Sequence, residues 1–83
     1  MKLLKHIKSI ALGYSEVFYK GEKYGVTRED FNGGKSIKVY AKALGGSHFI
    51  SFNYYLTSTS QLLKPCEMPA EEVIHFLKYY KSI

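Results

Sequence analysis

Strict alternation of apolar and polar side chains in the middle of the chain is the feature that most constrains the fold. In KSIKVYAKAL (35–44) every second side chain from Ile37 is apolar, and HFISFNYYL (48–56) repeats this pattern from Ile50. A period of two places alternate side chains on opposite faces of an extended strand. Two glycines between the segments favour a turn. The sequence therefore predicts two adjacent antiparallel strands that share one apolar face.

Turn residues divide the flanking sequence into further short strands. Gly21 divides EVFYKGEKYGVTRE into the two strands of a hairpin. The asparagine and glycines of 31–34 and the polar residues of 57–60 mark the next turns. Residues 61–64 then pair back as a short fifth strand, which Pro65 ends.

Both ends of the chain show helical periodicity. Apolar residues spaced by three and four predict a helix within 1–12. A second helix is expected over 69–82, because Pro69 suits the first helical position. Glu71 near its positive N-terminal end and Lys81 near its C-terminal end complement the helix dipole.

Together these elements predict a single α+β domain over residues 1–83. Its centre is a small antiparallel sheet of four or five strands in hairpin order within 15–64, with an N-terminal helix and a C-terminal helix packed on the sheet. A chain of 83 residues buries only about 60–65% of its unfolded surface, so its stability is modest. The aromatic fraction of 16% excludes a disordered chain.

The chain lacks the residue groups on which common enzyme chemistries depend. The three histidines are far apart and no CxxC pair is present, so we expect no metal site and no cofactor. NGGKS (32–36) resembles the end of a phosphate-binding loop, but Glu29 stands where that loop needs its first glycine. We therefore expect a non-catalytic binding or interaction module rather than an enzyme.

Cys66, the single cysteine, is the one weak catalytic candidate. It lies between two prolines near the predicted helix start, where the helix N-terminus and Lys64 favour a thiolate. Glu67 opposes a thiolate, and the sequence places no histidine base beside the cysteine. We expect Cys66 to fill the corner between the last strand and the helix. A thiol-dependent redox or transfer activity is the alternative.

The polar face of the predicted sheet is the strongest candidate binding site. If the apolar positions face the C-terminal helix, lysines and aromatic rings project from the other face. The candidate binding residues are Lys38, Tyr40, Lys42, Phe49, Asn53 and Tyr55. Rings stack on unpaired bases and lysines hold phosphates, so this face suits single-stranded nucleic acid or another polyanion. The alternative is that the N-terminal helix covers this face as a second layer.

The distribution of charge is compatible with a polyanionic partner. The formal net charge is +5, and residues 35–64 include lysines but no acid. The alternative is ordinary solubilising charge. A homodimer is a further possibility, formed through an exposed strand such as 49–56 or through the N-terminal helix.

No segment of the chain is typical of export or membrane insertion. Lysine and histidine interrupt every apolar run near the N-terminus, and no run approaches the ~18 apolar residues of a spanning helix. A single cysteine permits no internal disulfide. We therefore expect a soluble protein of the cytoplasm with no membrane partner.

Three segments resemble a family of small bacterial proteins to which no activity is assigned. They are KVYAKALGG (38–46), the SFNYY that follows (51–55) and LKPCEMP (63–69). The resemblance spans residues 16–80 and leaves the N-terminal helix outside. It implies a bacterial origin and gives no residue a functional role.

Overall fold

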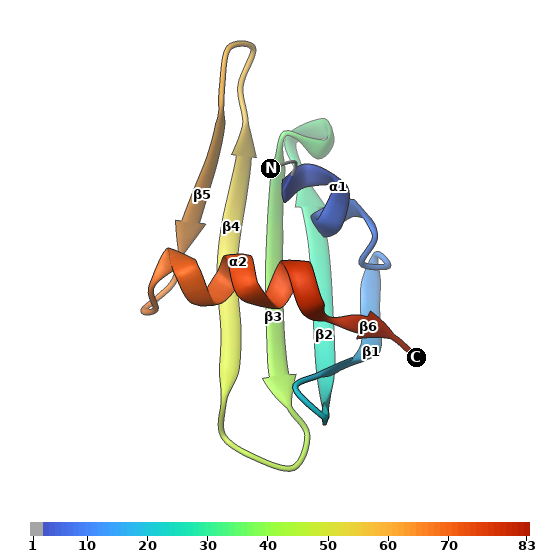
Figure 1. Cartoon of the computed structure of the whole chain (residues 1–83). Helices are drawn as coiled ribbons and strands as arrows, with labels where there is room; N and C mark the ends of the chain where they lie inside the picture. The colour runs from blue at the N-terminus through green and yellow to red at the C-terminus, as the bar shows by residue number, and fades with distance from the viewer. Residues whose placement is uncertain (1–2) are drawn as a thin grey trace.

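The computed structural model describes residues 3–83 as one antiparallel sheet with two helices on one face (Figure 1). The strands are β1 (Gly13–Tyr19), β2 (Glu22–Phe31), β3 (Ser36–Ala43), β4 (Phe49–Leu56), β5 (Gln61–Pro65) and β6 (Lys81–Ser82). The helices are α1 (Leu3–Lys8) and α2 (Ala70–Tyr79). The strand order across the sheet is β5-β4-β3-β2-β1-β6. The predicted α+β class and hairpin order are confirmed, and β6 is a strand that the sequence did not predict.

Residues with positive φ close the first two hairpins, where the sequence has turn signals. Lys20 (φ 52°) and Gly21 (φ 76°) form the two-residue link between β1 and β2. Positive φ at both positions is the type I′ geometry, which matches the twist of the flanking strands. Asn32 and Gly33 also have positive φ in the short 3-10 turn between β2 and β3. These turns fix the register and hence the face on which each side chain lies.

The alternation in the sequence sorts the side chains of the sheet as predicted. The buried apolar residues of β1 to β4 all lie at inward positions, and they are Val17, Tyr19, Tyr24, Val26, Ile37, Val39, Ala41, Ala43, Ile50, Phe52 and Tyr54. Helix α2 adds Val73, Phe76 and Leu77 to the same core. The Phe76 ring meets the Tyr19 ring edge to face, with centroids 5.0 Å apart. The described core therefore lies on one side of the sheet only.

Both helices cover the same face of the sheet (Figure 1). Ile7 of α1 and Ile10 just after it are buried in the core that α2 completes. At the end of α2, the Tyr80 hydroxyl donates to the His6 carbonyl oxygen at 2.9 Å. The alternative that the N-terminal helix covers the lysine-rich face is therefore wrong. Within residues 3–83, no helix lies on that opposite face.

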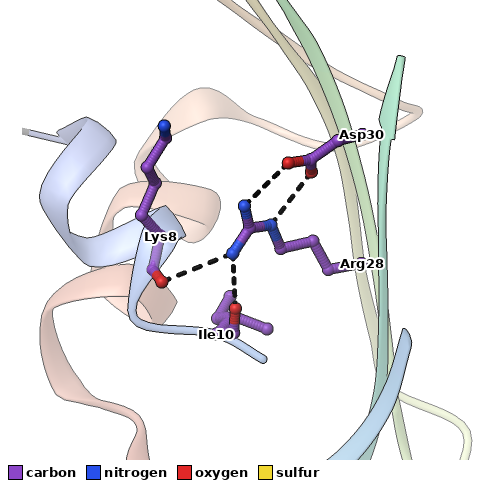
Figure 2. A network of polar contacts seen from close by, with 4 residues as sticks. All are labelled: Lys8, Ile10, Arg28 and Asp30. Carbon is purple, nitrogen blue, oxygen red and sulfur yellow. Dashed lines mark hydrogen bonds and ion pairs between the residues drawn. The ribbon is translucent and has the colours of Figure 1, made fainter. Parts of the chain in front are cut away.

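A buried arginine ties α1 to the sheet (Figure 2). Arg28, on the helix-covered side of β2, is only 7% exposed. Its Nη1 donates to the carbonyl oxygens of Ile10 at 2.7 Å and Lys8 at 3.3 Å. Its Nε and Nη2 donate to the Asp30 carboxylate at 3.0 and 2.8 Å. The guanidinium therefore satisfies carbonyl groups at the end of α1 that lack helical partners.

Helix α1 is shorter than its sequence pattern predicts. It ends at Lys8 instead of residue 12. The Ile10 N–H bonds the Ile7 carbonyl oxygen at 3.0 Å in a tight final turn, and the Ile10 side chain then enters the core. Residues 1–2 of the predicted helix lie outside the described residues.

The C-terminal helix is also shorter than predicted. Pro69 is its N-cap, with extended backbone, rather than its first helical residue. Tyr80 is likewise extended, so the helix ends before it, and Lys81 and Ser82 pair with β1. This pairing covers part of an edge whose backbone groups would otherwise be free. Lys81 therefore lies in a strand and not in the last helical turn.

Strand β5 forms one edge of the described sheet, and β6 with the unpaired part of β1 forms the other. Strand β4 pairs with β3 on one side and β5 on the other, so 49–56 is not an exposed strand through which two copies could pair. Strand β5 ends in Lys64 and Pro65, two residue types that discourage pairing between sheet edges. The β5 edge is therefore poorly suited to an edge-to-edge dimer.

Candidate functional site

The face opposite the helices, called the open face below, is formed by alternate side chains of five strands. They are Tyr14, Glu16 and Phe18 of β1, Lys23, Gly25, Thr27, Glu29 and Phe31 of β2, Ser36, Lys38, Tyr40 and Lys42 of β3, Phe49, Ser51, Asn53 and Tyr55 of β4, and Leu62 and Lys64 of β5. They alternate with the core positions, so the pleat of the strands places them on one side. The described chain lays no helix over them.

The open face displays many exposed apolar side chains. They are Tyr14, Phe18, Phe31, Tyr40, Tyr55 and Leu62, with Leu44 just beyond the end of β3. Tyr14 is 61% exposed and Tyr40 is 42% exposed. Single exposed apolar residues are ordinary, but a gathered set marks an interaction surface.

The strand register places lysines and rings side by side on the open face. Lys38 lies directly opposite Asn53, and Asn53 lies opposite Lys64. Farther along the same strands, the Phe49 and Tyr40 rings stack with centroids 6.1 Å apart and planes at 24°. Because neighbouring strands are about 4.8 Å apart, cationic and aromatic groups lie within one side-chain length of each other.

Charge is unevenly divided over the open face. The part formed by β3, β4 and β5, called the basic half, carries Lys38, Lys42 and Lys64 and no carboxylate. The part formed by β1 and β2, called the mixed half, carries Glu16, Glu29 and Lys23. The basic half therefore attracts anions, while the mixed half is close to neutral.

Gly25 lets the side chains of Tyr14 and Leu44 pack directly against the backbone of β2 on the mixed half. A Cβ atom at Gly25 would lie 2.6 Å from Tyr14 Oη and 3.2 Å from Leu44 Cδ2. The Tyr14 hydroxyl also donates to the Glu16 carboxylate at 3.2 Å. Tyr14 and Leu44 thus cover the sheet where β2 has no side chain of its own, as aromatic residues do over strand glycines.

All of the predicted binding residues lie on the open face. They are Lys38, Tyr40, Lys42, Phe49, Asn53 and Tyr55. Phe49 and Asn53 are half-buried, and the other four are exposed. Basic charge and exposed rings share one surface, which is the geometric condition that polyanion binding needs.

Cys66 lies beside the basic half and not in the corner where we expected it. The residue is half-buried, and its Sγ lies 3.7 Å from Asn53 Nδ2. Its N–H donates to the Ser51 carbonyl oxygen at 2.9 Å. Because Asn53 belongs to the open face, the thiol lies on that side of the sheet. Among the described residues no hydrogen bond links Cys66 to a histidine, so a nucleophile–base pair is not assembled.

Two histidines contact core tyrosines on the helix-covered side. Tyr24 Oη lies 2.9 Å from His48 Nδ1, and Tyr19 Oη lies 2.5 Å from His75 Nδ1. Burial raises the pKa of both tyrosines above its ordinary value. His48 Nε2 lies 3.9 Å from the Glu72 carboxylate. These contacts satisfy hydroxyl groups at the margin of the core, which is a structural role.

Sequence reasoning missed these tyrosine–histidine contacts and the Arg28 anchor. Each contact joins residues far apart in the chain, by 56 positions for Tyr19 and His75. The one local signal for the anchor was the single arginine of the chain, Arg28, at a position of the strand pattern that the apolar Val26 shares.

Neither a cluster of metal-binding side chains nor a membrane-spanning helix is found in the described part of the chain. Within residues 3–83, no three side chains of the histidine, cysteine or carboxylate type come together around a possible metal position. None of the helices there has the length and apolar character that spanning a bilayer demands.

Comparison of the chain with protein-family models, with curated proteins and with solved structures finds no match. The open face is therefore defined by the residues of this chain alone.

Proposed function

We propose that the basic half of the open face binds single-stranded nucleic acid. One observation carries the proposal: three lysines and three rings share one helix-free surface, and the strands that form it contribute no carboxylate. They are Lys38, Lys42, Lys64, Tyr40, Phe49 and Tyr55. Lysines neutralise phosphates, and rings stack on bases of any sequence. In this proposal the protein is a non-catalytic binding module of a bacterial cytoplasm.

The spacing of these side chains suits an extended run of nucleotides. Residues on one face of a strand are about 6.6 Å apart, so Tyr55, Asn53 and the row of Tyr40 form successive steps along the strands. Lys38 and Lys64 flank the Asn53 step. Rings at the outer steps offer stacking platforms, and the Asn53 amide offers a donor and an acceptor to a base edge.

Fluorescence anisotropy with a labelled oligothymidylate at several salt concentrations tests the charge contribution. For single strands, log K falls with log salt by about 0.7 per phosphate contact, so three lysines predict a slope near −2. Lys38→Ser should reduce the slope by about 0.7. The matched control is Lys78→Ser on α2, which should leave the slope unchanged. Absence of binding at low salt, or equal effects of the two variants, contradicts the proposal.

Tyr40→Ala tests stacking separately from charge. Stacking of one base on a ring contributes about 1–3 kcal/mol, so this variant should bind roughly 5- to 150-fold more weakly with the same salt slope. Tyr79→Ala is the control, because Tyr79 is an exposed ring on α2. Equal losses in the two variants would place binding away from the open face.

A further inference from the structure

We propose that two copies of this chain close their open faces on each other about a twofold axis that runs along the strands between β2 and β3. The basic half of one copy then covers the mixed half of the other. The dimer does not depend on the function proposed above. A second part of the proposal does rest on that function: the dimer and single-stranded nucleic acid compete for the open face. Through this competition, self-association regulates nucleic-acid binding.

The aromatic rings of the mixed half are exposed to solvent, and no other part of residues 3–83 buries them. Tyr14, Phe18 and Phe31 are exposed, and they lie outside the basic half. A nucleic acid held by the basic half leaves these rings in water. A second protein surface removes them from water, which the hydrophobic effect favours.

Charge complementarity identifies that second surface as another copy of the chain. The register places Glu29 directly opposite Lys38 in the neighbouring strand, at the same height along the sheet. A twofold axis along the strands preserves this height and lays β3 over the β2 strand of the partner. Lys38 then faces the partner's Glu29, and symmetry makes this contact twice. An in-plane axis across the strands would set one basic half against the other, which like charges oppose.

The same axis sets large side chains against small ones. Tyr40 lies opposite Thr27 in the sheet, and Phe31 lies opposite Ser36. In the dimer, Tyr40 therefore faces the partner's Thr27, and Phe31 faces the partner's Ser36. Alternation of large and small residues lets two packed layers interdigitate. Two aligned sheets cross at an angle of about 30°. This crossing angle shifts the strands of one copy relative to those of the other, and the shift is smallest for β2 and β3, which lie beside the axis.

The open face is large enough for a stable interface. Strands β1 to β5, about 4.8 Å apart and on average about 25 Å long, give a footprint of roughly 600 Å² per copy. A closed pair buries about 1,200 Å², which reaches the lower bound of ordinary specific interfaces. The helices stay outside, so closure needs no change of fold.

Sedimentation velocity over a concentration series tests the dimer. The wild-type chain should show a concentration-dependent dimer. Lys38→Glu and Glu29→Lys should each weaken self-association by at least about tenfold, because each sets like charges face to face twice. Mixed in equal amounts, the two variants should pair as tightly as wild type, since both contacts become attractive. Lys78→Glu on α2 is the control with the same charge change, and it should dimerise normally.

The outcomes separate the two proposals. The dimer is refuted if the wild-type chain stays monomeric at every concentration. It is also refuted if the two variants fail to dimerise on mixing although circular dichroism shows that both are folded. Either result leaves the nucleic-acid proposal intact. Wild-type dimers that bind oligothymidylate without dissociating refute the competition alone. If the monomer that is present at low protein concentration does not bind oligothymidylate, the nucleic-acid proposal is refuted and the dimer proposal is unaffected. Oligothymidylate that converts dimers into bound monomers supports both.

Discussion

Replacing Arg28 with methionine removes the side chain that holds α1 on the helix-covered face. Methionine keeps an unbranched apolar stem, so the change removes mainly the guanidinium and little packing. The two carbonyl groups at the end of α1, of Lys8 and Ile10, lose their donor. The Asp30 carboxylate, whose side chain is 24% exposed, loses its partner and turns to water.

The geometry gives the magnitude of the effect. The 2.7 Å bond from the charged donor to the Ile10 carbonyl oxygen contributes about 1.5–3 kcal/mol. The 3.3 Å bond to Lys8 and the partly solvated pair with Asp30 contribute less than about 1 kcal/mol each. Arg28→Met should therefore cost about 3 kcal/mol of the 4–12 kcal/mol that roughly 0.05–0.15 kcal/mol per residue gives a chain of this length.

Urea unfolding followed by circular dichroism measures this loss, and amide hydrogen exchange shows where it falls. We expect a lower midpoint and faster exchange in α1 than in β3 and β4. Asp30→Asn should cost about 1 kcal/mol or less, because the bonds to the α1 carbonyls remain. A loss below about 1 kcal/mol for Arg28→Met, or equal losses for the two variants, would refute the view that Arg28 acts as the anchor of α1.

Three further changes test the core and the open face. Phe76→Ala empties a fully buried position and should cost about 3–5 kcal/mol, seen as a large fall in thermal midpoint, and a fall of only a few degrees would be inconsistent with the described core. Burial raises the pKa of Tyr54 above 10.0, so the unfolded chain loses the hydroxyl proton at a lower pH than the folded chain does. The contribution of Tyr54 to stability is therefore complete below pH 10 and declines as the pH rises further. A urea midpoint that is equal at pH 9 and pH 11 would contradict this. Gly25→Ala should displace the exposed Tyr14 ring and change stability by less than about 1 kcal/mol, whereas a larger loss in urea unfolding would mean that the ring cannot yield.

The sheet was predictable because its signal is local. Alternation around Val39 and Phe52 assigns every second residue to a buried face, and glycine-rich turns such as the one at Gly21 set the hairpin order. The candidate binding residues follow from the same alternation, since the face opposite a one-sided core must hold them. For this reason the open-face positions of β3 and β4 could be predicted residue by residue.

The placement of the helices could not be read from local patterns. Whether α1 covers the core face or the open face depends on Arg28 and Tyr80, which contact its carbonyl groups from 20 and 74 positions away. Two-residue strands such as β6 give no periodic signal at all. The same limit explains Cys66, whose side of the sheet follows from the β4–β5 register and not from its neighbouring prolines.

Amide NMR titration with a short oligothymidylate, at low and moderate salt, tests the central claim most directly, because it reports every surface at once. The account predicts shifts concentrated in 38–42, 49–55 and 62–66, weakening as salt rises, with the amides of α2 little changed. Unchanged spectra, or shifts centred on α2, would contradict the assignment of the basic half as a nucleic-acid-binding surface.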